Sequence, residues 1–350
     1  MAKTTLATGN AQTVKVWSEK VFRESRKAAY FTRMMGKEGT ICTELTDLTK
    51  DKGDLVNVPF IQRSTAAGVT SGSTLEGAED SLTFANYQLS LEQYRNALRD
   101  DGALTRKRAG FDLPAESQSV LKVWGGEKID SLLFTAGQNA PTIVGYLDAG
   151  TTRFTATTTT ASAALTATDL ITPRLIENVK TFAKTGGNRR MNPLAPVSVG
   201  GKKYFVLMVH PDVGNDLRND STWAQAHREA MERSADNPIF QDALGIWGGV
   251  VVHEHENVAV YTNGGPTSAT PYATCMFMGE GALAWAWGQR EQVVYKTFDF
   301  DNEQGWAWGI IAGAGKPQFT YVSSSGSNTR DYGMLGFYVA RTQISDITLS

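Results

Sequence analysis

Two predicted strands that enclose a long, soft connection constrain this fold more than any other feature of the sequence. Residues 54–64 and 81–94 carry alternating apolar side chains, and the segment between them, RSTAAGVTSGSTLEGAED, is small, flexible and acidic. Compact domains rarely keep so long a structureless connection unless it has a function. A two-stranded ribbon is barely stable alone in water. The sequence therefore predicts a ribbon built to reach another surface.

The side-chain alternation adds detail to the two strands of this ribbon. Pro59 in the first strand is tolerable only on an edge or exposed strand. In the second strand, Leu82 and Phe84 share one parity, whereas Tyr87, Leu89 and Leu91 share the other. Such a slip predicts a bulge or a bend in the second strand.

A long helix is predicted after the ribbon. Asp112 supplies an N-cap, Pro114 suits the first turn, and apolar residues recur at helical spacing as far as Gly137. Gly125 and Gly126 in its middle weaken the helix and predict a kink.

The chain beyond this helix mixes both kinds of element. TTRFTATTTTASAALTAT predicts an exposed loop, and a second helix is expected from a cap at Thr168 or Asp169 to Gly186–Gly187. Residues 215–235 predict a third helix. Strands are predicted at YFVLMV, WGGVVVHEHENVAVY, ATCMFMG, ALAWAW, EQVVYKTFDF, GWAWGII and MLGFYVAR. This order indicates an α+β fold rather than a regular βαβ array.

Charge is concentrated at the N-terminus. Residues 1–40 carry eight basic and three acidic side chains, a net charge of +5, which leaves −7 for the other 310 residues because the whole chain has −2. Apolar residues in this segment recur every three or four positions, which predicts an amphipathic helix over residues 13–35. This helix either packs on its own domain with a solvated basic face or serves as an arm toward a neighbour or a polyanion.

Composition excludes several classes of protein. A net charge of −2 rules out a uniformly basic nucleic-acid coat. No apolar run is long enough to span a membrane, and MAKTTLATGNAQTVKVW lacks the apolar core of a signal peptide. Cys42 and Cys275 form neither a disulfide framework nor a metal knuckle and are expected to be buried apolar groups. These features predict a soluble cytoplasmic protein.

The sequence contains no established catalytic or phosphate-binding motif. The best metal candidate is the pair His253 and His255, which lie on one face of a predicted strand and would need further ligands from His210, Asp212 or His227. The alternative is a polar, exposed strand face. His210-Pro211-Asp212 is interpreted as a turn after a buried strand.

Tryptophans alternate with alanines in two predicted strands. Trp285 and Trp287 flank Ala286, and Trp306 and Trp308 flank Ala307. This period of two places large side chains on one face of each strand. A sheet that packs its heavy face on helices explains the pattern without a ligand, so no active site is predicted.

These predicted elements occur in the same order along the chain as in a known protein family, which the sequence resembles. The matching text is WSEKVFRESRKAAYFTRMMGKEG, DLTKDKGDLVNVPFIQR, WGGEKIDSLLFTAGQN and GIWGGVVVHEHENVAVY. It resembles the major capsid proteins of tailed bacteriophages with the Hong Kong 97-type fold, in particular those of podophages that carry a virion RNA polymerase. The resemblance spans about residues 13–345.

The resemblance implies a division of the chain and a role for each part. The expected parts are an N-terminal arm at residues 1–49, an extended β-ribbon loop at 50–105, a peripheral domain with the spine helix at 106–190, an axial domain at 191–290, and return strands of the peripheral domain with the C-terminus at 291–350. The implied function is structural, without catalytic residues, cofactor or metal. Hexamers and pentamers of the chain would form an icosahedral shell around double-stranded DNA in the virion, assembled in the host cytoplasm without a membrane.

The implied partners are further copies of the chain, a portal protein, packaged double-stranded DNA bound without sequence preference, and in some virions a decoration protein. Because the family-like text begins by residue 13, a separate scaffolding protein is expected instead of a leader. The basic residues expected to face DNA are Lys15, Lys20, Arg23, Arg26 and Lys27.

Some relatives join subunits through an isopeptide bond from a lysine of the extended loop. This chain has no lysine between Lys52 and Lys107. A non-covalent clasp is expected instead, in which a neighbouring subunit meets the loop tip through Leu75, Glu76, Glu79 and Asp80. Two alternatives remain open: an encapsulin-like protein compartment, and a metal-dependent hydrolase that uses His253 and His255.

Overall fold

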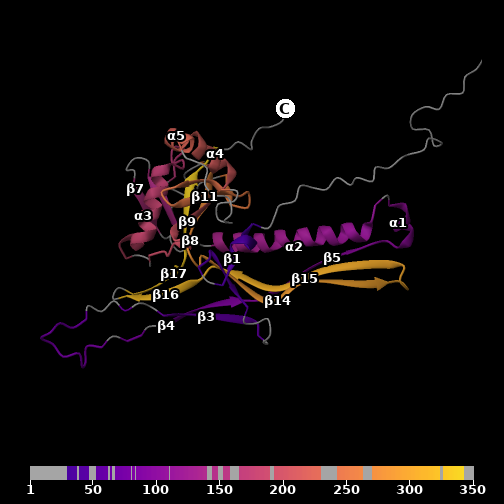
Figure 1. The fold of residues 1–350 in the computed structure, drawn as a ribbon, viewed down its shortest axis with the longest axis horizontal. Coiled ribbons are helices and arrows are strands. Elements are labelled where there is room, and N and C mark those ends of the chain that lie inside the picture. Colours follow the sequence, from indigo (N-terminus) through magenta and orange to yellow (C-terminus); the bar gives the residue numbers. More distant parts are fainter. Residues whose placement is uncertain are drawn as a thin grey trace, which may run out of the picture. The chain divides into compact units, whose positions relative to one another are not determined.

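The computed structural model describes residues 30–37, 39–46, 53–61, 64, 68–79, 81–82, 84–109, 111–139, 144–148, 153–157, 165–189, 193–229, 243–262, 270–323 and 326–342 (Figure 1). These residues form two compact units. The first unit takes its described residues from Tyr94–Glu127 and Glu291–Ile310, and the second takes them from Ala29–Gln93, Lys128–Arg290 and Ile311–Ser350.

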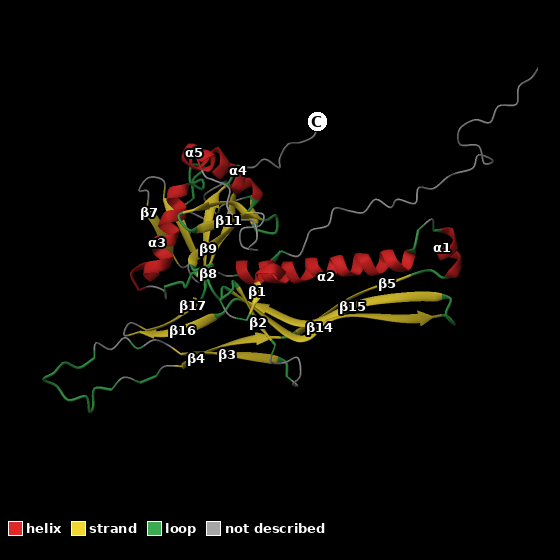
Figure 2. Cartoon of the chain, in the orientation of Figure 1, coloured by secondary structure: helices red, strands yellow, loops and turns green. Residues whose placement is uncertain are grey.

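A nine-stranded sheet organises the second unit (Figure 2). Its strand order is β10-β11-β9-β13-β18-β6-β7, and β8 and β12 pair at the sides with β9 and β13. The bounds are β6 (Val144–Asp148), β7 (Arg153–Thr157), β8 (Val197–Val199), β9 (Lys202–Val209), β10 (Ala243–Trp247), β11 (Val250–Glu254), β12 (Val260–Tyr261), β13 (Tyr272–Met278) and β18 (Met334–Ala340). The predicted exposed loop of threonines and alanines is wrong at Arg153–Thr157, which pairs antiparallel with β6.

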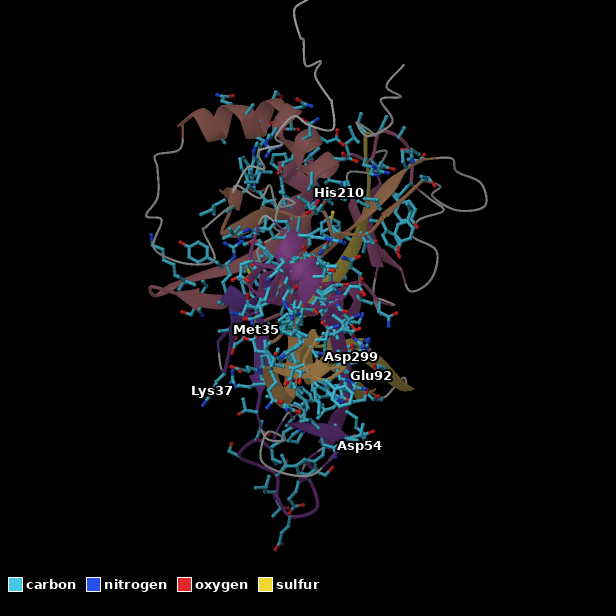
Figure 3. All side chains as sticks on the ribbon, turned by 90° about the vertical axis from the view of Figure 1, so that its right-hand side faces the viewer. Met35, Lys37, Asp54, Glu92, His210 and Asp299 are labelled. Atoms are coloured by element: carbon cyan, nitrogen blue, oxygen red, sulfur yellow. The ribbon has the colours of Figure 1, made fainter. Side chains whose placement is uncertain are left out.

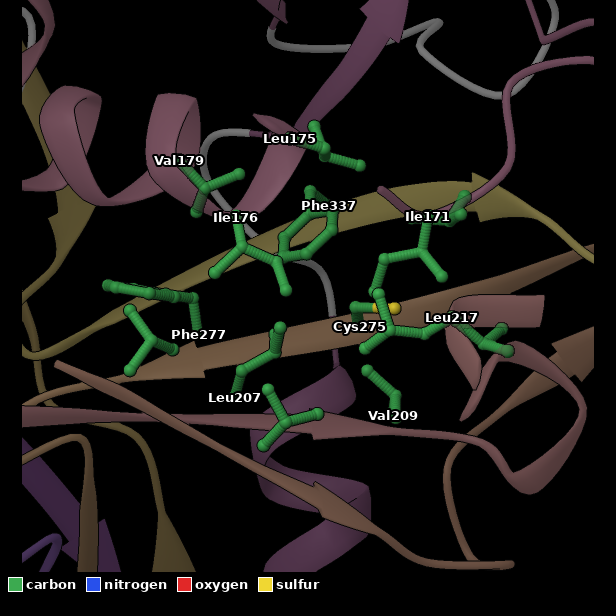
Figure 4. Packing of buried hydrophobic residues seen from close by; sticks show 14 of the residues in the cluster. Ile171, Leu175, Ile176, Val179, Leu207, Val209, Leu217, Cys275, Phe277 and Phe337 are labelled. Carbon is green, nitrogen blue, oxygen red and sulfur yellow. The ribbon is translucent and has the colours of Figure 1, made fainter. Parts of the chain in front are cut away.

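The main core of the second unit lies between this sheet and three helices, α3 (Pro173–Arg189), α4 (Pro211–Asn219) and α5 (Ser221–Glu229). Leu175, Ile176 and Val179 recur on one face of α3 and pack over Phe277 and Phe337 of the sheet (Figure 4). All five side chains are buried. Each contributes about 1.5–3 kcal/mol by leaving water, so this face fixes the helix on the sheet.

The ends of these helices differ from the predicted ones. The hydroxyl of Thr172 accepts from the N–H of Leu175 (3.2 Å), so Thr172 caps α3 in place of Thr168 or Asp169. The helix also continues through Gly186–Gly187 to Arg189. The predicted helix at 215–235 is interrupted, because the Asp220 carboxylate accepts from Thr222 and Trp223 N–H groups and starts α5.

Shorter strands complete the second unit. A 3₁₀ turn, η1 (Phe31–Met34), leads into β1 (Met35–Gly36) and β2 (Cys42–Leu45), so the helix predicted for 13–35 does not extend over its last residues. The predicted ribbon is present as β3 (Leu55–Ile61) and β4 (Phe84–Ser90), with a second hairpin at β16 (Gln318–Ser323) and β17 (Gly326–Asp331).

The register of β3 and β4 is unbroken, so the predicted bulge within the second strand is wrong. The side-chain parity changes because Leu82 and Phe84 are exposed. The strand ends at Ser90, and β5 (Glu92–Arg99) then joins a different sheet of order β1-β2-β14-β15-β5.

The predicted long helix is α2 (Leu113–Gln138), and Asp112 accepts from the Ala115 N–H (3.4 Å) as its cap. It is preceded by a short helix, α1 (Ala103–Arg108). Within the first unit, the rings of Trp124 and Trp308 meet edge to face at 5.5 Å. The tryptophan face of the strand therefore packs on a helix, as predicted.

Two predicted strands merge into one. ALAWAW and the first part of EQVVYKTFDF form β14 (Leu283–Phe298), which turns at residues 299–302 into β15 (Glu303–Gly315). Asp299 and Phe300, predicted to be strand residues, lie in that turn. Cys42 and Cys275 are buried, as predicted, and burial raises the pKa of both thiols well above the ordinary range. No helix in the described part of the chain is long and apolar enough to cross a membrane.

Candidate interaction surfaces

The ribbon of β3 and β4 is anchored at its base. Val56 and Leu89, which are cross-strand partners, are buried against Ala284 and Ala286 of β14. Further along, the Phe60 ring stacks on Phe319 with centroids 4.4 Å apart. These contacts supply the supporting surface that a two-stranded ribbon needs.

The far end of the ribbon is exposed and apolar. Ile61 and Phe84 face each other across the strands, and both leave more than half of their surface in water. Leu75 and Leu82 in the connection are 63% and 69% exposed. Large apolar side chains left exposed at this end of the ribbon and in its connection are typical of a segment that another protein covers.

The tip of the connection is shaped by local hydrogen bonds. Thr70 O accepts from the N–H groups of Gly72 (2.7 Å) and Ser73 (3.0 Å), and Leu75 O accepts from Ala78. Gly77 has a φ of 83° and donates its N–H to Glu79 Oε2 (2.7 Å). The structure thus places Leu75, Glu76 and Glu79 on one exposed turn, while Asp80 lies outside the described residues.

The five basic residues predicted to face DNA lie outside the described residues. The chain that follows them is fixed to the second unit by Asp130 of α2. Its buried carboxylate accepts from the backbone N–H groups of Tyr30 and Phe31, the latter at 2.9 Å. Burial raises the pKa of Asp130, against the opposing effect of these two hydrogen bonds.

The candidate metal residues His253 and His255 form part of an aromatic cluster. The ring of Tyr30 lies 5.6 Å from the ring of His253 and 5.1 Å from that of His255. The two histidines thus share one face, as predicted, but His253 is fully buried, so the predicted exposed face is wrong. Tyr30 covers it from a segment far away in sequence.

Within the described part of the chain, neither histidine belongs to a metal-binding group. Among the residues that the structure describes, no set of three or more His, Cys, Asp or Glu side chains is placed to hold a metal ion. His210, labelled in Figure 3, does not form a simple turn but caps α4, because its Nδ1 accepts from the N–H of Asp212 (3.2 Å). Burial lowers the pKa of His210 despite the nearby Asp212 carboxylate.

The first unit contains a polar network that the sequence did not indicate. Asp100, at the end of β5, accepts from the Gln304 N–H (2.7 Å) and the Gly102 N–H (3.3 Å), and pairs with Arg106 of α1. Burial raises the pKa of Asp100, but the hydrogen bonds and the arginine outweigh this effect and lower it below its usual range. The network joins β5, α1 and the start of β15.

The turn between β14 and β15 carries a fully exposed aromatic ring, Phe300, between Asp299 and Asp301. Asp299 is labelled in Figure 3. The sequence signal for this turn is the run of aspartate and asparagine, residue types enriched where φ is positive. The alternating apolar residues of EQVVYKTFDF predicted a strand that continues through Phe300, so the turn was not predicted.

A family model described as phage capsid protein matches residues 5–342, nearly the whole chain. The chain belongs to the phage capsid protein family. The capsid protein is 26% identical to the major capsid protein of Pseudomonas phage KPP25, over 93% of this chain and 94% of that protein.

Solved structures agree with this assignment. The capsid protein resembles the capsid of Ralstonia phage GP4 with a TM-score of 0.79 and 25% identity, over 98% and 99% of the two chains. It also resembles the capsid of cyanophage Pam1 with a TM-score of 0.77 and 20% identity, over 97% and 99%. These are capsid proteins of the Hong Kong 97-like type, so the predicted α+β capsid fold is confirmed.

The family decides between the functional alternatives. Phage capsid proteins are structural, so the prediction of a non-enzymatic shell protein of the virion is confirmed. The metal-dependent hydrolase and the protein compartment are not favoured. The relevant sites of this capsid protein are therefore the surfaces that neighbouring subunits cover.

Proposed function

We propose that this protein is the major subunit of an icosahedral shell, in which its hexamers and pentamers enclose double-stranded DNA. The observation that carries the proposal is a set of exposed apolar side chains: Ile61 and Phe84 at the far end of the ribbon, and Leu75 and Leu82 in the connection beyond it. A segment that is anchored at its base and apolar at its end suits a contact between copies. Several such contacts per subunit turn weak pairwise binding into a durable shell.

The parts of the chain take the roles that the family resemblance implies. Residues 1–49 form an arm, 50–105 the extended loop, 106–190 and 291–350 the peripheral domain, and 191–290 the axial domain. The ribbon β3–β4 and the long helix α2, found within the second and third of these five ranges, support this division.

We infer that the loop tip closes a non-covalent clasp on an adjacent subunit. Leu75 enters a shallow apolar site, while Glu76, Glu79 and Asp80 meet arginines or lysines of the neighbour. Exposed ion pairs contribute only about 0.2–1 kcal/mol each, so the apolar side chains supply most of the binding energy. The sequence has no lysine between Lys52 and Lys107, so the ribbon and its tip lack the amine that a covalent link from them would need.

The remaining partners rest on the resemblance and on sequence charge. The basic residues Lys15, Lys20, Arg23, Arg26 and Lys27 face the packaged DNA, because neutralising phosphates needs no base contacts. A separate scaffolding protein, a portal protein and, in some virions, a decoration protein complete the assembly in the host cytoplasm. Kinship with the podophages that carry a virion RNA polymerase remains a prediction.

Electron microscopy and a denaturing gel test the proposal together. Negative staining of the purified chain is expected to show capsomers or closed particles, and protein that stays monomeric at every concentration would refute shell formation. Boiled particles are expected to give a single band near 38.0 kDa. A ladder of covalent oligomers would refute the non-covalent clasp while leaving the shell intact. Uniform shells formed by this chain alone would refute the need for a scaffolding protein.

A further inference from the structure

The turn between β14 and β15 presents a phenylalanine where the backbone is strained. Asp299, Phe300 and Asp301 have φ angles of 47°, 49° and 67°. A bulky residue in this left-handed region is a genuine outlier and persists only where the surroundings fix it. The Phe300 ring is fully exposed and so adds nothing to the packing of its own unit. Glycine or asparagine would suit this backbone better, which indicates that the ring serves a contact outside the chain.

Asn302 fixes this turn to α1. Its side-chain amide donates to Asp299 Oδ2 (3.2 Å), and its Oδ1 accepts from the Ala103 N–H (3.2 Å). Its carbonyl accepts from Arg106 Nη2 (3.0 Å). The turn and α1 therefore move as one piece, and Phe300 is held away from the helix of its own chain.

One face of α1 matches the turn in chemistry. Leu104 is 60% exposed, and Lys107 and Arg108, three and four residues later, are exposed on the same face. An apolar side chain flanked by two cations thus lies on α1, and an aromatic ring flanked by two carboxylates lies on the turn. The two surfaces complement each other in sign and in polarity.

We propose that the turn of one copy docks on the α1 face of a second copy. Phe300 covers Leu104, and Asp299 and Asp301 pair with Lys107 and Arg108 of that copy. This proposal rests on the proposed function, because it needs an assembly of many copies. The proposed contact runs head to tail, with the turn of each copy on the α1 face of the next, and such a heterologous contact closes into rings when the rotation between copies permits.

A cysteine pair tests the contact directly. Assembled particles of the full chain carrying F300C and L104C are oxidised and run on a non-reducing denaturing gel. We expect a ladder of dimers and larger oligomers, because the F300C cysteine of each chain forms a disulfide with the L104C cysteine of the next chain. The native Cys42 and Cys275 are buried and do not compete. A matched double variant, V294C with L104C, places the first cysteine at an exposed site on β14 and is expected to stay monomeric.

The other outcomes overturn the proposal in distinguishable ways. Closed particles that yield only monomers for F300C with L104C would refute the contact and leave the proposed shell function standing. Dimers from F300C alone would show that turn meets turn and refute the α1 site. Failure of the wild-type chain to assemble into any particle or capsomer would refute both proposals.

Discussion

Trp308 of β15 packs so closely against Gly125 of α2 that a Cβ on this glycine would lie 2.5 Å from two ring atoms. A distance under 3 Å cannot be accommodated without movement of the indole or the helix. The glycine, at which a kink is predicted, lies within one uninterrupted helical span, Leu113–Gln138, and makes room for the tryptophan.

We predict that Gly125→Ala destabilises the first unit despite the better helix propensity of alanine. Overpacking costs about 1–3 kcal/mol, against a propensity gain of about 1 kcal/mol. Urea unfolding of the unassembled chain, followed by tryptophan fluorescence, measures the change. Gly126→Ala adds the same methyl one residue further along the helix and serves as the matched control. Equal stability of both variants would show that the Trp308 contact is not tight.

Asp100 makes the stability of the first unit depend on pH. Its pKa is lowered in the folded protein, so its contribution is present above the unfolded value of about 3.9 and is lost as the pH falls through the folded pKa. Asp100→Asn is expected to cost about 1.5–3 kcal/mol at pH 7, the range for hydrogen bonds to a charged group. The difference from wild type should shrink below about pH 4. Asp101→Asn, at an exposed neighbour, should change little at either pH.

Asp130→Ala should release the segment that begins at Tyr30. The substitution leaves two buried N–H groups without their acceptor, each at a cost of about 1–3 kcal/mol. Hydrogen exchange at the Phe31 amide is expected to accelerate, and limited proteolysis should cut near this residue. Ser131→Ala, an exposed position on the same helix, is the control. Unchanged exchange at Phe31 in Asp130→Ala would contradict the anchoring role.

Much of this fold was predictable because its signals are local. The cap at Asp112 and the helical period predicted α2, and alternation predicted the ribbon, because each depends on neighbours in sequence. The burial of His253 was not predictable, since Tyr30 covers it from more than two hundred residues away. The turn at Phe300 was not predicted, because an alternation of apolar residues does not indicate the residue at which a strand ends.

Neutralising Lys20, Arg23, Arg26 and Lys27 together should weaken DNA packaging or make it more sensitive to salt. Each phosphate contact releases a counterion, so losing four of them lowers the affinity for DNA. Genome content and particle melting across a salt series measure the effect. Unchanged values at every salt concentration would contradict a DNA-facing position for this segment.

Replacing Glu76, Glu79 and Asp80 with alanine should lower the melting temperature of the shell without abolishing capsomers. The three proposed ion pairs would each be weak, at about 0.2–1 kcal/mol, but would recur in every subunit. Differential scanning calorimetry of particles measures the change. Leu75→Ser is expected to have the larger effect, because it removes the apolar part of the contact. A shell that melts unchanged in both variants would refute the clasp.

A cryo-electron microscopy map of the assembled particle tests the central claim most directly. The account predicts density for the loop tip lying on an adjacent copy, with Leu75 buried there and with no covalent link between the chains. A map in which Leu75 and Phe84 remain in solvent, as they are in the isolated chain, would contradict it.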